Sequence, residues 1–278
     1  MKPIKIKILQ NRTFFRGFII SLAILVLTGG RNTAFAEVVV VPISLAFEAT
    51  MPASSLQKLV FIGKGLSNPV MYKILPAEGP GGNLQPAKFK IKTPYTGNFQ
   101  PLDKFRTVLS KTGDERTEAL LFVEIDWDNI PGVYNTRMVS NSGEREVPIQ
   151  VTVLQKTIVS LNPAKFDLIP SDMKSPIVEK IQIFVASNSR QWHLYCMTES
   201  LTREGGTEQI NTSRVYVRQL SPDDSLSWHR LDKPFEVARG GPGPNRKVAT
   251  IELAFESKRE DRPGRYEGTF RFMISNSP

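Results

Sequence analysis

The chain has 278 residues, with 36 basic and 27 acidic side chains, two histidines and one cysteine. A single cysteine excludes an intramolecular disulfide, so any folded domain is held together by its apolar core. Residues 1–36 contain six of the basic residues and no acidic one, which leaves residues 37–278 with a net charge of only +3, and we therefore expect no nucleic-acid partner.

Residues 1–36 have the three parts of a secretory signal peptide. Five basic residues lie within the first sixteen positions, an apolar run follows from 17 to 28, and the small-residue site Ala34-Phe35-Ala36 precedes Glu37. The apolar run is 12 residues long, whereas a helix needs about 20 to cross the hydrocarbon core of a membrane. We predict a cleavable signal peptide and export to the periplasm, the cell surface or the medium. We expect no transmembrane segment in the mature chain.

Apolar and polar residues alternate with a period of two in many segments of residues 37–278, for example 119–127, 147–153 and 249–255. This pattern is typical of strands with one buried face and one wet face, and hence of antiparallel sheets. The chain has twenty prolines and nineteen glycines, and most of them lie between these segments, as expected of turns between strands. The fold class that follows is all-β.

Several short motifs of the first half recur in the same order in the second half, at an offset that rises from 116 to 132 residues. A rising offset is expected of two copies whose second has gained loop insertions. We predict a signal peptide at 1–36, a first β-sandwich domain at 37–155 and a second at 156–278. The matching motifs are Ile43-Ser44-Leu45 with Val159-Ser160-Leu161, Ser67-Asn68 with Ser187-Asn188, Leu102-Asp103-Lys104 with Leu231-Asp232-Lys233, and Pro131-Gly132-x-Tyr134 with Pro263-Gly264-x-Tyr266.

The Pro-Gly-x-Tyr motif links an alternating strand to the next one in both copies. Proline presets the φ angle of the turn, glycine supplies an unusual backbone angle, and Tyr134 or Tyr266 opens the next strand. This arrangement resembles the tyrosine corner of immunoglobulin-like sandwiches, and it is similar to the closing hairpin of bacterial surface and pilin-like β-domains. The resemblance implies two tandem antiparallel immunoglobulin-like domains and implies no activity.

A second resemblance is to periplasmic pilus chaperones, which also have two immunoglobulin-like domains behind a signal peptide. The segment 147–154 lies where such a chaperone has its exposed alternating strand, just before the second domain. The paired arginine and lysine of that family's cleft have no counterpart that we can place in this sequence.

We expect no catalytic, cofactor-binding or metal-binding residues. His193 and His229 have no ligand partner at a spacing of three or four residues, and no nucleophile elbow or phosphate-binding glycine motif occurs. The oxygen-rich segment 126–129 has side chains that could bind Ca²⁺, but we favour a turn that leads into the tyrosine corner. Cys196 is expected to be a small buried apolar residue.

The sequence favours a non-enzymatic exported β-sandwich protein that acts as a cell-surface, pilus-like or extracellular-matrix structural or adhesion module. One alternative is a pilus-type assembly chaperone. Another is a carbohydrate-binding or enzymatic sandwich, which exposed aromatic side chains near loop tips would favour; we instead expect Trp127, Trp192 and Trp228 to lie in the core.

Exposed strand edges are the predicted means of binding protein partners or of self-assembly. The strand after Tyr134 is followed by another at 147–153, whereas the strand after Tyr266 has no such successor. The second sandwich is therefore expected to expose an unpaired edge. The segment 37–47 is a candidate donor of the strand to another molecule. The interpretation that we favour is that the first strand of the second domain covers this edge, or that the segment 37–47 is the first strand of its own sandwich.

Overall fold

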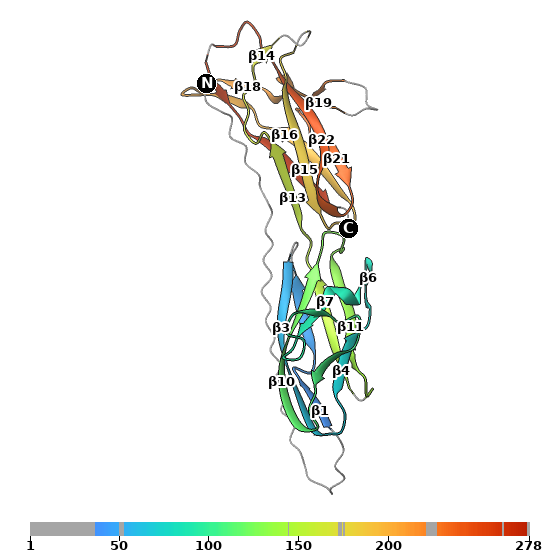
Figure 1. The fold of residues 1–278 in the computed structure, drawn as a ribbon. Helices are drawn as coiled ribbons and strands as arrows, with labels where there is room; N and C mark the ends of the chain where they lie inside the picture. The colour runs from blue at the N-terminus through green and yellow to red at the C-terminus, as the bar shows by residue number, and fades with distance from the viewer. Residues whose placement is uncertain are drawn as a thin grey trace. The chain divides into compact units, whose positions relative to one another are not determined.

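The structure is a computed structural model, and it describes residues 37–49, 53–143, 145–171, 174, 176–220, 227–262 and 264–276. The predicted signal peptide lies outside these residues. They fold as strands and two 3-10 turns, and they divide into two compact units, 37–125 with 132–154 and 126–131 with 155–276. We call the unit with β1 to β12 the first domain and the unit with β13 to β24 the second domain (Figure 1). The predicted boundary between residues 155 and 156 stays a prediction.

Two sheets make up the first domain. One has the strand order β1-β3-β10-β7-β8 and the other the order β2-β12-β11-β4-β9, with the hairpin β5–β6 attached to β11 and the 3-10 turn η1 before β7. Their bounds are β1 (Glu37–Val41), β2 (Leu45–Ala49), β3 (Ala53–Leu66), β4 (Val70–Ile74), β5 (Ala77–Gly79), β6 (Gly82–Leu84), η1 (Pro86–Lys88), β7 (Phe89–Lys92), β8 (Gln100–Pro101), β9 (Arg106–Leu109), β10 (Gly113–Ile125), β11 (Gly132–Ser140) and β12 (Glu146–Val153).

The order of these strands is that of an immunoglobulin-like sandwich. In order across each sheet, β1, β3, β10 and β7 take the A, B, E and D positions of one sheet, and β12, β11 and β4 take the G, F and C positions of the other. The first strand is shared between the sheets, because β1 pairs antiparallel with β3 and β2 pairs parallel with β12. The cis peptide bond Val41–Pro42 lies between these two pieces.

The second domain repeats this plan with fewer strands in the second sheet. Its sheets have the orders β13-β15-β22-β19-β20, with β14 beside β22, then β21-β16-β24, and a small sheet β18-β17-β23. Their bounds are β13 (Thr157–Asn162), β14 (Pro170–Ser171), β15 (Glu179–Ser187), β16 (Trp192–Thr198), β17 (Leu201–Arg203), β18 (Gln209–Ile210), η2 (Thr212–Arg214), β19 (Val215–Gln219), β20 (His229–Arg230), β21 (Phe235–Gly240), β22 (Gly243–Glu256), β23 (Tyr266–Glu267) and β24 (Phe270–Asn276).

Alternation along each strand determines which side chains enter the core, as the sequence predicts. Leu121 and Leu253, at equivalent places in the E strands β10 and β22, are fully buried. The two-domain, all-β, immunoglobulin-like fold is therefore confirmed.

The strand 147–154, which resembles an exposed chaperone strand in sequence, is not an open edge along most of its length. Strand β12 pairs with β11 on one side and, over Ile149–Val153, with β2 on the other. Its apolar side chains, Val147, Ile149, Val151 and Val153, are all buried. The exposed strand that the resemblance to pilus chaperones implies at this place is not found, because the first strand of the domain crosses to this sheet and covers β12.

Candidate functional site

The candidate site is the outer edge of β24, the strand that follows the tyrosine corner of the second domain. The hydroxyl of Tyr266 donates to the backbone carbonyl of Arg262 at 3.1 Å, which is the hydrogen bond expected of such a corner. In the first domain, the buried ring of Tyr134 lies against Gly79, where a Cβ atom would come within 2.3 Å of the ring. Both tyrosines precede or begin the F strand of their sandwich, so β24 is the counterpart of β11.

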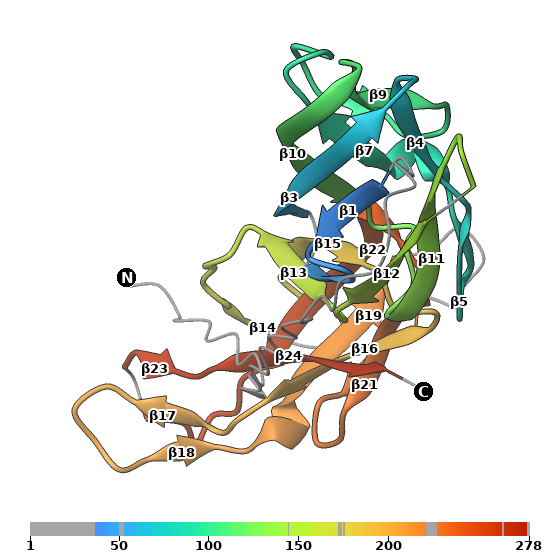
Figure 2. The same ribbon diagram turned by 90° about the horizontal axis from the view of Figure 1, so that it is seen from below.

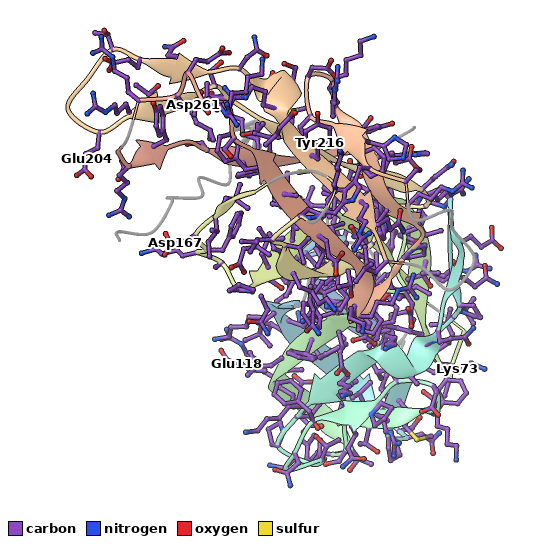
Figure 3. All side chains as sticks on the ribbon, turned by 90° about the horizontal axis from the view of Figure 1, so that it is seen from above. Lys73, Glu118, Asp167, Glu204, Tyr216 and Asp261 are labelled. Carbon is purple, nitrogen blue, oxygen red and sulfur yellow. The ribbon has the colours of Figure 1, made fainter. Side chains whose placement is uncertain are left out.

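Paired carboxylate and guanidinium groups hold the loop before this corner in place. The carboxylate of Asp261 accepts hydrogen bonds from Arg214, one of them at 2.8 Å, and from the backbone N–H of Lys258 at 2.7 Å. The same guanidinium donates to the backbone carbonyl of Glu256, at the end of β22. The bond from Arg214 lowers the pKa of Asp261 below its usual value. Figure 3 shows Asp261 at the end of the domain that carries the small sheet, with Glu204 further out.

The two F strands differ in their neighbours. Strand β11 lies between β12 and β4, and it pairs with β12 from Gly132↔Val153 to Val139↔Glu146. Strand β24 pairs with β16, from Phe270↔Thr198 to Asn276↔Trp192, and in the described part of the chain no other strand pairs with it. Figure 2 shows β24, in red, running beside β16. Since alternate residues of a strand direct N–H and C=O groups to each side, the outer edge of β24 presents backbone groups that pair with no other strand of the described residues.

Side chains on β13 and on β24 are less completely packed than their counterparts in the first domain. The first strand of the first domain buries Val38 and Val40, whereas β13, its counterpart, has no buried residue. Val159 and Leu161 of β13 and Ile274 of β24 are only half-buried, although all three pack against the core of the second domain. Apolar side chains of both β13 and β24 that pack against this core therefore remain partly exposed.

Little in β24 protects its edge from pairing. Natural edge strands are usually blocked by proline, lysine or a bulge. Strand β24 has the sequence FRFMISN, without proline or lysine, and it keeps an unbroken register with β16 over seven residues. Its one charged side chain, Arg271, forms an ion pair with Glu199. The edge therefore remains able to accept another strand.

The segment after β13 also differs from its counterpart. In both domains the first strand ends at a cis X–Pro bond, Val41–Pro42 or Asn162–Pro163. In the first domain the chain then forms β2 beside β12, whereas residues 163–169 form no strand. The ring of Phe166 in this segment packs against Phe270, with the ring centroids 5.4 Å apart. The segment thus contacts the first residue of β24 through one side chain, and its described residues form no strand along the outer edge of β24.

The residues that sequence analysis considered for chemistry do not come together. His193 lies 3.3 Å from Glu236, and the ring of His229 stacks on Phe235. Asp126 and Asn129 bond to each other within one turn, through backbone N–H groups, which agrees with the turn that we favoured over a Ca²⁺ site. Across the residues that the structure describes, no group of three or more His, Cys, Asp or Glu side chains could hold a metal ion.

Cys196 is buried in the core of the second domain, as predicted, and desolvation raises the pKa of its thiol. Trp192 is buried there too, and its indole N–H donates to the carbonyl of Gly241 at 2.9 Å. The expectation that all three tryptophans lie in the core was wrong for Trp127 and Trp228, which are half-buried. No helix among the described residues is long and apolar enough to cross a membrane.

Comparison with known proteins adds only general likenesses. No protein-family model matches the sequence. No curated protein matches it either. Among solved structures, the chain is similar to a chaperone–tip adhesion subunit pre-assembly complex from the archaic chaperone-usher Csu pili of Acinetobacter baumannii. The two sequences are 11% identical, the TM-score is 0.40, and the match covers 86% of this chain and 99% of that chain. It is also similar to titin domains Z1Z2 in complex with telethonin, with 12% identity, a TM-score of 0.30 and coverage of 86% and 95%. At these TM-scores the likenesses carry no weight, and the assignment of the fold rests on strand order.

Proposed function

We propose that this chain is an exported, non-enzymatic structural or adhesion-type module that binds another protein through the outer edge of β24. One observation carries the proposal. The same position in the first domain is filled by β12, while β24 has a strand neighbour on one side only among the described residues. An edge of this kind is either covered or used to recruit a strand.

Neither alternative function has an observation of equal strength. A chaperone that presents the strand 147–154 would need that strand's edge free, and β2 pairs with it over five residues. A carbohydrate-binding face would need uncovered aromatic rings. Tyr95, Phe99 and Phe105 are exposed, but the ring of Phe105 has the ammonium group of Lys73 over it, the ring of Phe99 packs against Phe122, and the hydroxyl of Tyr95 bonds to Glu115. The ring of Trp228 likewise has the guanidinium of Arg218 over it, 4.5 Å from the ring centroid, a cation–π contact that competes with stacking by a ligand.

Site-specific photo-crosslinking in cells that produce the protein tests the proposal. A photoreactive side chain replaces Met273 of β24 in one variant and Val133 of β11 in the other. These two side chains are equally exposed, at 43% each, on F strands of the two domains. They differ in that β11 has strands on both sides.

We expect a covalent adduct with one protein, identified by mass spectrometry, from position 273 and not from position 133. Equal adducts at both positions would mean non-specific contact. The absence of any adduct from position 273, in a protein shown to be folded and exported, would refute binding at this edge.

A further inference from the structure

We infer that the partner supplies an extended strand that runs antiparallel to β24 and carries branched aliphatic residues at every second position. This inference rests on the proposed function, and it specifies the chemistry of the partner and the way in which it binds. The strand would occupy in the second domain the place that β12 occupies in the first.

The direction and pattern of the strand follow from the complete copy within the same chain. Strand β12 runs antiparallel to β11. Every second side chain of β12 is aliphatic and buried, and the side chains between them are exposed or half-buried. Because β24 and β11 hold the same place after the tyrosine corner, a strand beside β24 has its inward side chains over the core of the second domain.

The inward side chains of the partner strand have identifiable neighbours. Val159 and Leu161 of β13, together with Ile274 of β24, face this core and remain half-buried. A strand with valine or isoleucine at alternate positions would complete their burial, and the removal of each such side chain from water favours binding. Backbone hydrogen bonds to β24 then add affinity without regard to side-chain identity.

The donor is a different protein and not a second copy of this chain. The candidate donor segment 37–47 forms β1 and part of β2, as the interpretation that we favoured predicts. Its side chains Val38, Val40, Leu45 and Phe47 are buried in the core of the first domain. Release of this segment to another molecule would expose these side chains and unpair both strands. Donation by a second copy would therefore unfold the first domain of the donor.

The decisive experiment adds a synthetic peptide with the sequence of β12, Glu146–Val153, to the mature protein 37–278. Amide hydrogen exchange is followed along the whole chain. We expect exchange in β24 to slow by about tenfold or more at saturating peptide, since opening now requires loss of the added strand. A control peptide has the same residues rearranged so that the aliphatic ones are adjacent, and it should leave exchange in β24 unchanged.

A chain extension provides the matched variant. Ser140-Asn141-Ser142 and Ser275-Asn276-Ser277 have the same sequence, and in the first domain this tripeptide leads into the β11–β12 connection, where the N–H of Gly143 donates to the carbonyl of Ser140. The segment 143–153 placed directly after Ser277 should therefore fold back onto β24. We expect this variant to bind the free peptide at least about tenfold more weakly, because the edge is already paired.

The outcomes separate this inference from the proposed function. Protection of β2 or β9 in place of β24, or unchanged peptide binding by the extended variant, overturns the inference. An adduct at position 273 without protection by any alternating peptide leaves the proposed function standing and refutes strand addition. Concentration-dependent self-association of the mature protein that protects β24 would show that a second copy is the donor and would refute the assignment of a different protein.

Discussion

Truncation of one valine in each domain tests whether the second sandwich is incomplete. Val40 of β1 and Val159 of β13 lie on equivalent first strands, each antiparallel to the B strand of its domain. Val40 is 4% exposed, whereas Val159 is half-buried. Substitution of valine by alanine removes two methyl groups at about 0.8 kcal/mol each when they are buried, together with a cavity term. We expect Val40→Ala to cost roughly 2 kcal/mol and Val159→Ala less than about 1 kcal/mol.

Because two domains need not unfold together, the assay is hydrogen exchange of peptides from each domain as a function of denaturant. The free energy of opening is then read separately for β3 and for β15. Addition of the alternating peptide should raise the cost of Val159→Ala towards that of Val40→Ala, since the added strand buries the side chain. Equal costs for the two variants without peptide would contradict the reasoning, because β13 would then be as well packed as β1.

Four further results are expected. Intact-mass measurement of exported material should give a chain that begins at Glu37, and a mass that retains residues 17–28 would contradict cleavage. Leu121→Asp and Leu253→Asp should each unfold their own domain, as followed by hydrogen exchange, because each places an unpaired charge in an apolar layer. If both variant proteins keep the cooperative unfolding transition of the wild-type protein, the buried faces of these strands are wrongly assigned. Tyr266→Phe should lower the stability of the second domain by about 1 kcal/mol, the net value of one hydrogen bond, and an unchanged denaturation midpoint would argue against the corner bond. The pKa of Asp261 is lowered in the folded protein, so this carboxylate stabilises the fold above the usual pKa of 3.8, and the stabilisation is lost as pH falls through the folded pKa. Asp261→Asn should therefore destabilise the second domain at neutral pH and make its stability less dependent on pH below about 4. Parallel profiles of stability against pH for the wild-type protein and the variant would refute this.

Local sequence patterns predict the parts of this fold that depend on neighbours along the chain. The alternation around Leu121 and Leu253 indicates which face is buried, because successive side chains of a strand point to opposite faces. The Pro-Gly-x-Tyr motif identifies the start of each F strand for a similarly local reason. The alternation at 147–153, which follows the first F strand, is visible in the sequence for the same reason.

The neighbours of each strand are determined only in the tertiary structure. Backbone hydrogen bonds between strands are chemically alike for almost every residue, so the sequence of 147–153 indicates a strand without revealing that β2 covers it. The half-burial of Val159 likewise depends on residues far away in the chain. The sequence by itself determined that residues 37–278 form two all-β sandwiches, because side-chain alternation is a local property. Only the tertiary structure decided that, among the residues it describes, β12 lies between two strands while β24 lies beside one, because strand pairing joins segments that are distant in sequence.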